Sequence, residues 1–383
     1  MKLNRLGATD LYVSEVGLGC EHLEKKEEAV VLSVVGEAID LGINVMDVFM
    51  PEPNVRTYIG KALKGRRDKV IVQGHIGAAW QNGQYLRTRD EKINKTYFED
   101  LLTRLQTDYM DIGMLHFIDT IEDWETVLHG PVMEYARKLK GQGVIRALGM
   151  SSHNATVSLA AVQSGLIDVL MFSLNPAFDL LPEGTDLESL FKKDSYQQKG
   201  LLGMNPVREQ LYRACESNGV GITVMKGFGA GTLLHADASP FRMALTPCQL
   251  LQYALERPGV GSVLVGCRTP DEVRKAAAFE TATEAEKDYS AILGALDAYA
   301  MTGRCMYCNH CLPCPSNIDI AQVNKYLDLA SGQKEVPASL QDHYDALSAH
   351  AGDCIACGQC EERCPFAVPV IRRMEEAQAL FGR

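Results

Sequence analysis

Residues 145–175 read IRALGMSSHNATVSLAAVQSGLIDVLMFSLN and contain one complete unit of a parallel α/β fold. An apolar run, Ile145–Ser151, predicts a buried strand, and a second such run follows at Val169–Asn175. The helix predicted between them, Ala155–Ser164, has Asn154 at the position of an N-cap. The stretch therefore predicts a strand, a helix and a second strand parallel to the first.

The same alternation runs through the first 280 residues. The other predicted strands are Val16–Cys20, Asn44–Val48, Val70–Gly74, Asp111–Phe117, Gly221–Lys226 and Ser262–Cys267. The other predicted helices are Lys26–Leu41, Val55–Leu63, Lys92–Leu105, Asp123–Lys140, Pro206–Ser217, Pro247–Glu256 and Pro270–Ala278. Eight strand–helix units are the count of a TIM (β/α)8 barrel. A doubly wound dinucleotide-binding sheet would favour a G-x-G-x-x-G motif at the start of the first helix, and this sequence has none there.

A TIM barrel carries its functional residues at the C-terminal ends of its strands. Four ionisable residues follow predicted strands two to four: Asp47, Glu52, His75 and His116. In one hypothesis they perform acid–base chemistry, with Glu52 as the proton donor and His75 as its relay. In a second hypothesis they bind a metal, together with His22, because two histidines and a carboxylate are a ligand set of catalytic zinc and non-haem iron.

A glycine-rich run follows the seventh predicted strand. It comprises Lys226, Gly227, Phe228, Gly229, Ala230 and Gly231. Glycines let backbone N–H groups approach the pyrophosphate of a nucleotide. The alternative is a plain turn between a strand and a helix.

Eight of the twelve cysteines lie in two short runs near the C-terminus. The second run, Cys354, Cys357, Cys360 and Cys364 before a proline, has the C-x2-C-x2-C-x3-C-P spacing of bacterial ferredoxins. The first run, Cys305, Cys308, Cys311 and Cys314, is one residue shorter before its last cysteine. These runs predict two 4Fe–4S clusters in a small, mostly helical, ferredoxin-like domain; structural zinc is the rival interpretation.

In ferredoxins the fourth cysteine of each run binds the other cluster. One cluster would then use Cys305, Cys308, Cys311 and Cys364, and the other Cys354, Cys357, Cys360 and Cys314. A segment this short has little core, so metal binding would supply much of its folding energy. Whether the clusters carry electrons or only hold the fold stays open, although two neighbouring clusters suit a one-electron relay.

Composition excludes two classes of partner and indicates the compartment. The formal net charge of -11 argues against non-specific binding to nucleic acid. No run of eighteen apolar residues predicts a membrane span, and the N-terminus lacks the apolar region of a signal peptide. We expect a cytoplasmic protein with a barrel over residues 1–282, a connecting helix over 283–300 and the ferredoxin-type domain over 301–383.

Several stretches resemble aldo/keto reductases. They are residues 6–19 (LGATDLYVSEVGLG), 42–47 (GINVMD), 59–63 (IGKAL), Leu115-His116, 145–151 (IRALGMS), 257–260 (RPGV) and 265–270 (VGCRTP). The resemblance runs from residue 1 to about residue 280. The cysteine runs look like the ferredoxin-type extension of one bacterial branch of that family.

The resemblance implies an Asp–Tyr–Lys–His tetrad that reduces a carbonyl group with hydride from a nicotinamide. Asp47 and His116 match two tetrad positions. Glu52 stands where the tyrosine belongs, and Gln73-Gly74-His75 occupies the place of the lysine. We therefore expect an atypical tetrad, made of Asp47, Glu52, His75 and His116.

The resemblance also implies a nucleotide site with altered residues. Ser151 and Ser152 stand where the family binds the nicotinamide carboxamide, while Met171 replaces a glutamine partner that forms hydrogen bonds. Gly266, Arg268 and Thr269 match the region that binds the adenosine phosphate, and Asn175 ends the sixth strand nearby. NADP(H) is the expected nucleotide, and a flavin is the less favoured alternative.

These observations predict an oxidoreductase that reduces a carbonyl or related unsaturated small molecule, with electron transfer through two 4Fe–4S clusters. The clusters would exchange electrons with a ferredoxin or another electron-transfer protein. Metal- or flavin-assisted redox chemistry at the same mouth is an alternative. A further alternative is a relay or regulatory protein whose barrel has lost catalysis.

Overall fold

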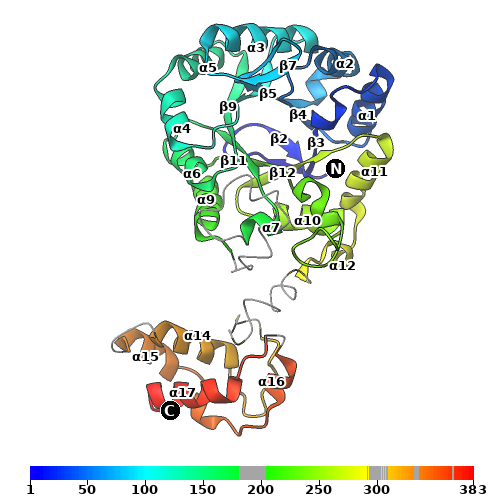
Figure 1. Cartoon of the computed structure of the whole chain (residues 1–383). Helices are drawn as coiled ribbons and strands as arrows, with labels where there is room; N and C mark the ends of the chain where they lie inside the picture. The colour runs from blue at the N-terminus through cyan, green and yellow to red at the C-terminus, as the bar shows by residue number, and fades with distance from the viewer. Residues whose placement is uncertain are drawn as a thin grey trace. The chain divides into compact units, whose positions relative to one another are not determined.

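The structure is a computed structural model, and it describes residues 1–180, 204–290, 292, 303, 305, 307, 309–331, 336–364 and 366–383. The chain divides into two compact units, with the boundary between Tyr289 and Ser290 (Figure 1). Half of the connecting helix expected over 283–300 lies outside the described residues, and α12 (Glu284–Lys287) falls within the described half.

The first unit is a closed barrel of eight parallel strands, as predicted. Around the barrel the order is β10, β11, β12, β3, β4, β5, β8 and β9. Their bounds are β3 Val16–Gly19, β4 Val45–Val48, β5 Ile71–Ile76, β8 Met110–Leu115, β9 Ile145–Ser152, β10 Val169–Ser173, β11 Gly221–Met225 and β12 Val260–Gly266. Every predicted strand overlaps one of these, because a strand buried on both faces is an apolar run visible in the sequence.

Helices surround the barrel (Figure 1). They are α1 Glu28–Asp40, α2 Pro53–Leu63, α3 Glu91–Leu105, α4 Ile121–Leu128, α5 Pro131–Gly141, α6 Ala155–Gln163, α7 Pro176–Asp179, α9 Pro206–Ser217, α10 Pro247–Leu255 and α11 Pro270–Ala277. The single helix predicted over Asp123–Lys140 is wrong, since α4 and α5 are separate. Pro131 has no N–H to continue α4 and starts α5 at its first position, after Gly130.

A hairpin that sequence reasoning did not predict closes the N-terminal end of the barrel. It consists of β1 (Leu3–Arg5) and β2 (Tyr12–Ser14). Leu6, Leu11 and Val13 from this hairpin are buried with side chains near the starts of the barrel strands. This apolar plug leaves the C-terminal ends of the strands as the open mouth.

A second hairpin, β6 (Ala78–Gln81) and β7 (Gln84–Arg87), lies between β5 and α3. It was also missed, although the dipeptide Asn82-Gly83 signals it. Both residues adopt left-handed conformations, with φ of 52° and 74°, which the tight turn of a two-residue hairpin requires. The hairpin follows a barrel strand at its C-terminal end and so stands beside the mouth.

The second unit is mostly helical among its described residues. Its helices are α14 Ile320–Ser331, α15 Ala338–Asp345, α16 Gln359–Arg363 and α17 Val370–Phe381. Arg373 of α17 binds Asn324 and Asp328 of α14, and the rings of Tyr344 and Phe381 stack at 4.1 Å. None of the described helices of the chain is long and apolar enough to cross a bilayer.

Candidate active site

A continuous row of hydrogen bonds occupies the mouth of the barrel. Nε2 of His75 lies 2.8 Å from Oδ1 of Asp47, and Nδ1 of His75 lies 2.7 Å from Nδ1 of His116. Nε2 of His116 lies 2.7 Å from the hydroxyl of Tyr85. Asp47, His75 and His116 come from the ends of β4, β5 and β8, as expected, while Tyr85 comes from the β6–β7 hairpin. We call these four residues the row.

With Asp47 ionised, the donors of the row form one consistent set. An ionised Asp47 only accepts, so Nε2 of His75 donates to it and leaves Nδ1 of His75 as an acceptor. Nδ1 of His116 then donates to His75, and Nε2 of His116 accepts from the hydroxyl of Tyr85. Every bond thus points from the tyrosine toward the carboxylate.

Burial keeps His116 uncharged. Asp47, His75 and His116 are 2%, 2% and 5% exposed, whereas Tyr85 is 45% exposed. Burial lowers the pKa of His116 well below its ordinary value, and His75 and Arg89 act in the same direction. Burial raises the pKa of Tyr85 despite the nearby Arg87 and Arg89. At neutral pH the row therefore contains a neutral His116 and a protonated phenol.

Sequence reasoning missed Tyr85 because this residue stands ten positions beyond His75, on a hairpin that the analysis did not predict. The ring of Phe49 packs against the row. Its centroid lies 5.5 Å from that of His116, on which it stacks, and 6.4 Å from that of Tyr85, which it meets edge-on. Arg89 donates to the backbone carbonyls of His116 and Phe117. Packing and hydrogen bonds thus fix the positions of the rings.

Glu52 lies close by but has other partners. Its carboxylate oxygens accept from the backbone N–H groups of Asn54 and Val55, at 3.0 and 2.7 Å, and so cap the start of α2. The hydrogen-bond partners of His75 are Asp47 and His116. The expectation that His75 relays protons to Glu52 is therefore corrected. A proton-donating role for Glu52 itself stays a prediction.

Replacing Glu52 by alanine should lower the free energy of unfolding by about 1 kcal/mol, because the first N–H groups of α2 lose their acceptor. Denaturant titration measures the change. Lys95→Ala, at an exposed position of α3, is the matched control and should stay within about 0.5 kcal/mol of wild type. Equal stability of the Glu52 and Lys95 variants would contradict the capping role.

The expected nicotinamide residues lie at the same end of the barrel. Ser151 Oγ accepts from the N–H of Phe117, and Ser152 Oγ donates to Asp119 at 3.0 Å. Met171 Sδ lies 3.8 Å from Nε2 of Gln73. Ser151, Ser152 and Met171 therefore already have partners within the barrel. In a site built to bind a ligand through all three, these side chains would be free to contact it.

The glycine-rich run has an unusual backbone. Lys226, Gly229, Ala230 and Gly231 all have positive φ, between 54° and 91°. Successive residues in such conformations can form concavities in which N–H groups bind anions. Gly227 and Phe228 lie between them, and Asn175 donates to the carbonyl of Lys226 at 2.9 Å. The run is thus a loop with a defined shape, tied to the end of β10.

Gly266 lies directly beneath the ring of His22: a Cβ at Gly266 would meet Cδ2 of His22 at 2.2 Å. Burial lowers the pKa of His22, and Arg268 and Lys226 add to the effect. Thr269 caps the start of α11. The structure therefore brings Gly266, Arg268 and Lys226 into one neighbourhood around His22, together with the acidic Glu21 and Glu272.

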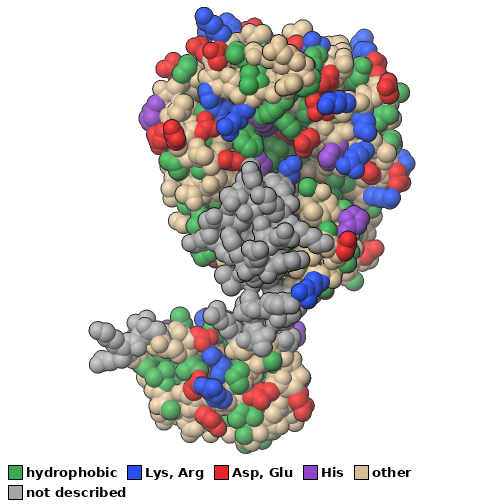
Figure 2. Space-filling view, viewed as in Figure 1, with side chains coloured by type: hydrophobic (Ala, Val, Ile, Leu, Met, Phe, Trp, Pro, Cys, Tyr) green, Lys and Arg blue, Asp and Glu red, His purple; other side chains and the backbone are tan. Residues whose placement is uncertain are grey.

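The hypothesis of a metal site at the mouth is not supported. Among the residues that the structure describes, no three His, Cys, Asp or Glu side chains are arranged to hold one metal ion. In the row, all four ring nitrogens of His75 and His116 already have hydrogen-bond partners. Figure 2 shows histidine side chains among hydrophobic ones near the middle of the visible barrel face.

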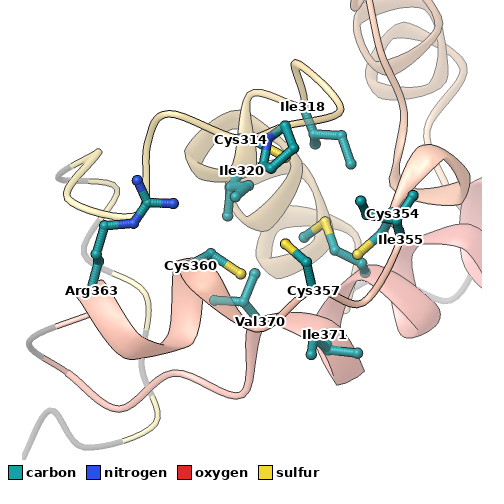
Figure 3. Close-up of a pocket in the computed structure, with 12 residues that line it drawn as sticks. Cys314, Ile318, Ile320, Cys354, Ile355, Cys357, Cys360, Arg363, Val370 and Ile371 are labelled. Carbon is teal, nitrogen blue, oxygen red and sulfur yellow. The ribbon is translucent and has the colours of Figure 1, made fainter.

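The predicted cluster cysteines line two hollows in the second unit. One hollow is lined by Cys314, Cys354, Cys357 and Cys360, with Ile318, Ile320 and Val370 as apolar neighbours (Figure 3). The other is lined by Cys305, Cys311 and Cys364. Cys308 is outside the described residues. Each hollow thus combines cysteines of one run with the last cysteine of the other run.

The chain is similar in sequence to known proteins. Residues 15–249 match the model of the aldo/keto reductase family. The chain is 32% identical over 294 residues to the uncharacterized oxidoreductase YqkF of Bacillus subtilis, covering 72% of this chain and 90% of that protein. It is 26% identical to L-galactose dehydrogenase of Arabidopsis thaliana over 317 residues, or 74% and 89% of the two chains.

Solved structures show the same likeness. The holo form of the aldo-keto reductase AKR11C1 from Bacillus halodurans superimposes with a TM-score of 0.60 at 25% identity. The superposition covers 78% of this chain and 98% of that protein.

Proposed function

The chain belongs to the aldo/keto reductase family and is an oxidoreductase, and from this premise we propose that it reduces the carbonyl group, or a related unsaturated bond, of a small molecule at the mouth of the barrel. The observation that carries the proposal is the hydrogen-bonded row at the strand ends. His75 takes the lysine's place beside Asp47, at 2.8 Å. An imidazole can both donate and accept a proton through its two ring nitrogens, so acid–base capacity is retained although the family's lysine is absent.

NADP(H) is the nucleotide that we propose for this site. The positive-φ loop from Lys226 to Gly231 suits a pyrophosphate, and Arg268 with Lys226 supplies positive charge for a further phosphate. When bound, the reduced nicotinamide supplies a hydride. The chain's own residues orient the substrate and exchange its proton. Flavin binding stays the less favoured alternative.

We further propose two 4Fe–4S clusters in the second unit. Support comes from the cysteines around each hollow, which follow the crossed sharing expected from ferredoxins. The four cysteines of the first hollow are all described, yet no three of them are arranged to hold one ion. A single zinc ion needs its thiolates gathered around one centre. A cubane binds each thiolate to a different iron, so its thiolates need not meet at one centre.

The chemistry proposed for the two units differs in the number of electrons transferred at a time. Reduction of a carbonyl takes an electron pair, while a 4Fe–4S cluster passes single electrons. A partner that carries single electrons, such as a ferredoxin, is therefore the proposed source or acceptor for the second unit. Cysteines with apolar neighbours such as Ile355, which is 66% exposed, offer a surface for contact with such a protein.

Anaerobic purification tests the proposed function directly. We expect about eight iron and eight sulfide per chain, with the broad visible absorption of 4Fe–4S clusters. We also expect NADPH-dependent reduction of a carbonyl probe such as 4-nitrobenzaldehyde. Zinc in place of iron and sulfide would contradict the clusters, and a bound flavin would favour the flavin-assisted alternative. Absence of carbonyl reduction with intact clusters would contradict the proposed reaction.

Cys314→Ser should remove the cluster held by the second run, although Cys314 belongs to the first. The reason is the crossed sharing, in which Cys314 shares its hollow with Cys354, Cys357 and Cys360. Iron analysis and electron paramagnetic resonance of the reduced protein measure the loss, about half of the iron. The control is Cys248→Ser, at a partly buried cysteine of the barrel unit, which should keep all of the iron. Full iron content in the Cys314 variant would contradict crossing.

A further inference from the structure

The row has one accessible end. Tyr85 is 45% exposed, and the other three members are nearly fully buried. Tyr85 is therefore the member through which the row meets solvent. At the inner end, Asp47 binds His75 and also accepts from Nε2 of Gln73 at 3.2 Å.

The row has two self-consistent arrangements that differ by one proton. In the first, Asp47 is ionised and every donor points inward, so the Tyr85 hydroxyl donates to His116. In the second, Asp47 carries a proton and donates to Nε2 of His75. Nδ1 of His75 then donates to Nδ1 of His116, and Nε2 of His116 donates to the oxygen of Tyr85. The hydroxyl proton of Tyr85 is now free to point outward.

We propose that Tyr85 is the acid that protonates the substrate, and that Asp47, His75 and His116 form the conduit that replaces its proton. This inference rests on the proposed function and deepens it. Tyr85 would supply the phenol that is absent at the position of Glu52, from a hairpin rather than from a barrel strand.

The reaction balances in the direction of reduction. A reduced nicotinamide, when bound, would supply the hydride of the new C–H bond, and the O–H bond of Tyr85 breaks as a new O–H bond forms on the substrate. His116 passes its Nε2 proton to the tyrosine oxygen, His75 passes its Nδ1 proton to His116, and Asp47 passes its proton to His75. The row ends in its inward arrangement. One proton from water then restores the outward arrangement, or oxidation of an alcohol runs the same steps in reverse.

The surroundings favour Tyr85 over Glu52 as the donor. Both oxygens of Glu52 accept hydrogen bonds from backbone N–H groups of α2. The hydroxyl of Tyr85 instead contacts His116, the next member of the row. The charged or titratable groups around His116 and Tyr85 are Arg87, Arg89, His75 and His153. The two arginines stabilise a transient tyrosinate.

Tyr85→Phe tests the proposal, because it keeps the ring against Phe49 and removes only the hydroxyl. We expect kcat for NADPH-dependent reduction of 4-nitrobenzaldehyde to fall by about 10²- to 10⁴-fold, the usual contribution of a general acid. The KM for NADPH should stay unchanged. Leu86→Ala, which is 37% exposed on the same strand, is the matched control and should retain wild-type turnover.

A second readout does not depend on activity. In the ¹⁵N spectrum of histidine-labelled protein, the Nε2 resonance of His116 should shift in Tyr85→Phe, since this nitrogen loses its hydrogen-bond partner. An unshifted His116 would overturn the contact. Wild-type turnover in Tyr85→Phe, or loss of turnover in Glu52→Gln with retention in Tyr85→Phe, would overturn the role of Tyr85 and leave the proposed function standing. An inactive wild-type enzyme would overturn both.

Discussion

Replacing Asp179 by alanine should lower the free energy of unfolding by about 3–5 kcal/mol, because the change leaves a buried arginine without its carboxylate. Asp179 is fully buried at the end of α7. Arg208 and Tyr212 of α9 donate to one of its oxygens, at 2.7 and 2.6 Å. Tyr253 of α10 donates to the other oxygen at 2.8 Å. One carboxylate therefore joins three helices.

The tyrosines around Asp179 act as neutral donors. Burial raises the pKa of Tyr212 and of Tyr253 well above the ordinary value. Arg208 additionally donates to the carbonyl of Ser173 on β10, so the cluster ties the helices to the barrel.

Chemical denaturation of Asp179→Ala and wild type measures the difference. Glu209→Ala is the matched control on α9, because Glu209 pairs with Arg213 at an exposed site and should change stability by about 0.5 kcal/mol or less. An Asp179 variant as stable as the control would show that Arg208 finds another partner or water.

Replacing Asp47 by asparagine should lower kcat by about 10²- to 10⁴-fold while leaving the fold intact. The asparagine oxygen can still accept from Nε2 of His75, so the geometry of the row survives. An amide does not bind the additional proton that the outward arrangement needs at Asp47. The amide nitrogen can donate to Nε2 of His75 but releases no proton to it, so the row could not replace a proton given to the substrate.

Turnover of 4-nitrobenzaldehyde with NADPH measures the effect, and circular dichroism checks the fold. Asp111→Asn is the matched control. Asp111 is another buried carboxylate of the barrel, 2% exposed near the start of β8 and paired with Arg67 and Arg146. It should affect stability but not kcat. Wild-type kcat in Asp47→Asn would contradict proton transfer through the row.

The sequence predicted most of the barrel, for a reason seen in the strands. Side chains of a buried parallel strand are apolar on both faces, and helices carry their own start signals, as Asn154, Asn205 and Thr246 show at three N-caps. The two hairpins were missed because their strands are three or four residues long and have no such run. The split between α4 and α5 was missed although Gly130-Pro131 marks it.

The site was predicted in part. Asp47, His75 and His116 meet at the mouth because parallel strands of a closed barrel end on the same side, which makes the strand-end rule reliable. Glu52 was assigned because it stands where the family's tyrosine belongs, and the structure shows its carboxylate at the start of α2. Tyr85 could be assigned from neither position nor periodicity.

The sequence by itself determined the β/α rhythm, the residues at the strand ends and the spacing of the two cysteine runs. These are local properties, since each follows from the backbone period of a strand or helix or from a few neighbouring residues. Only the tertiary structure decided that Tyr85 meets His116, 31 residues away, and that Asp179 meets Tyr253, 74 residues away. Such contacts depend on where a hairpin folds and how the closed barrel brings distant elements together, and no local spacing specifies that geometry.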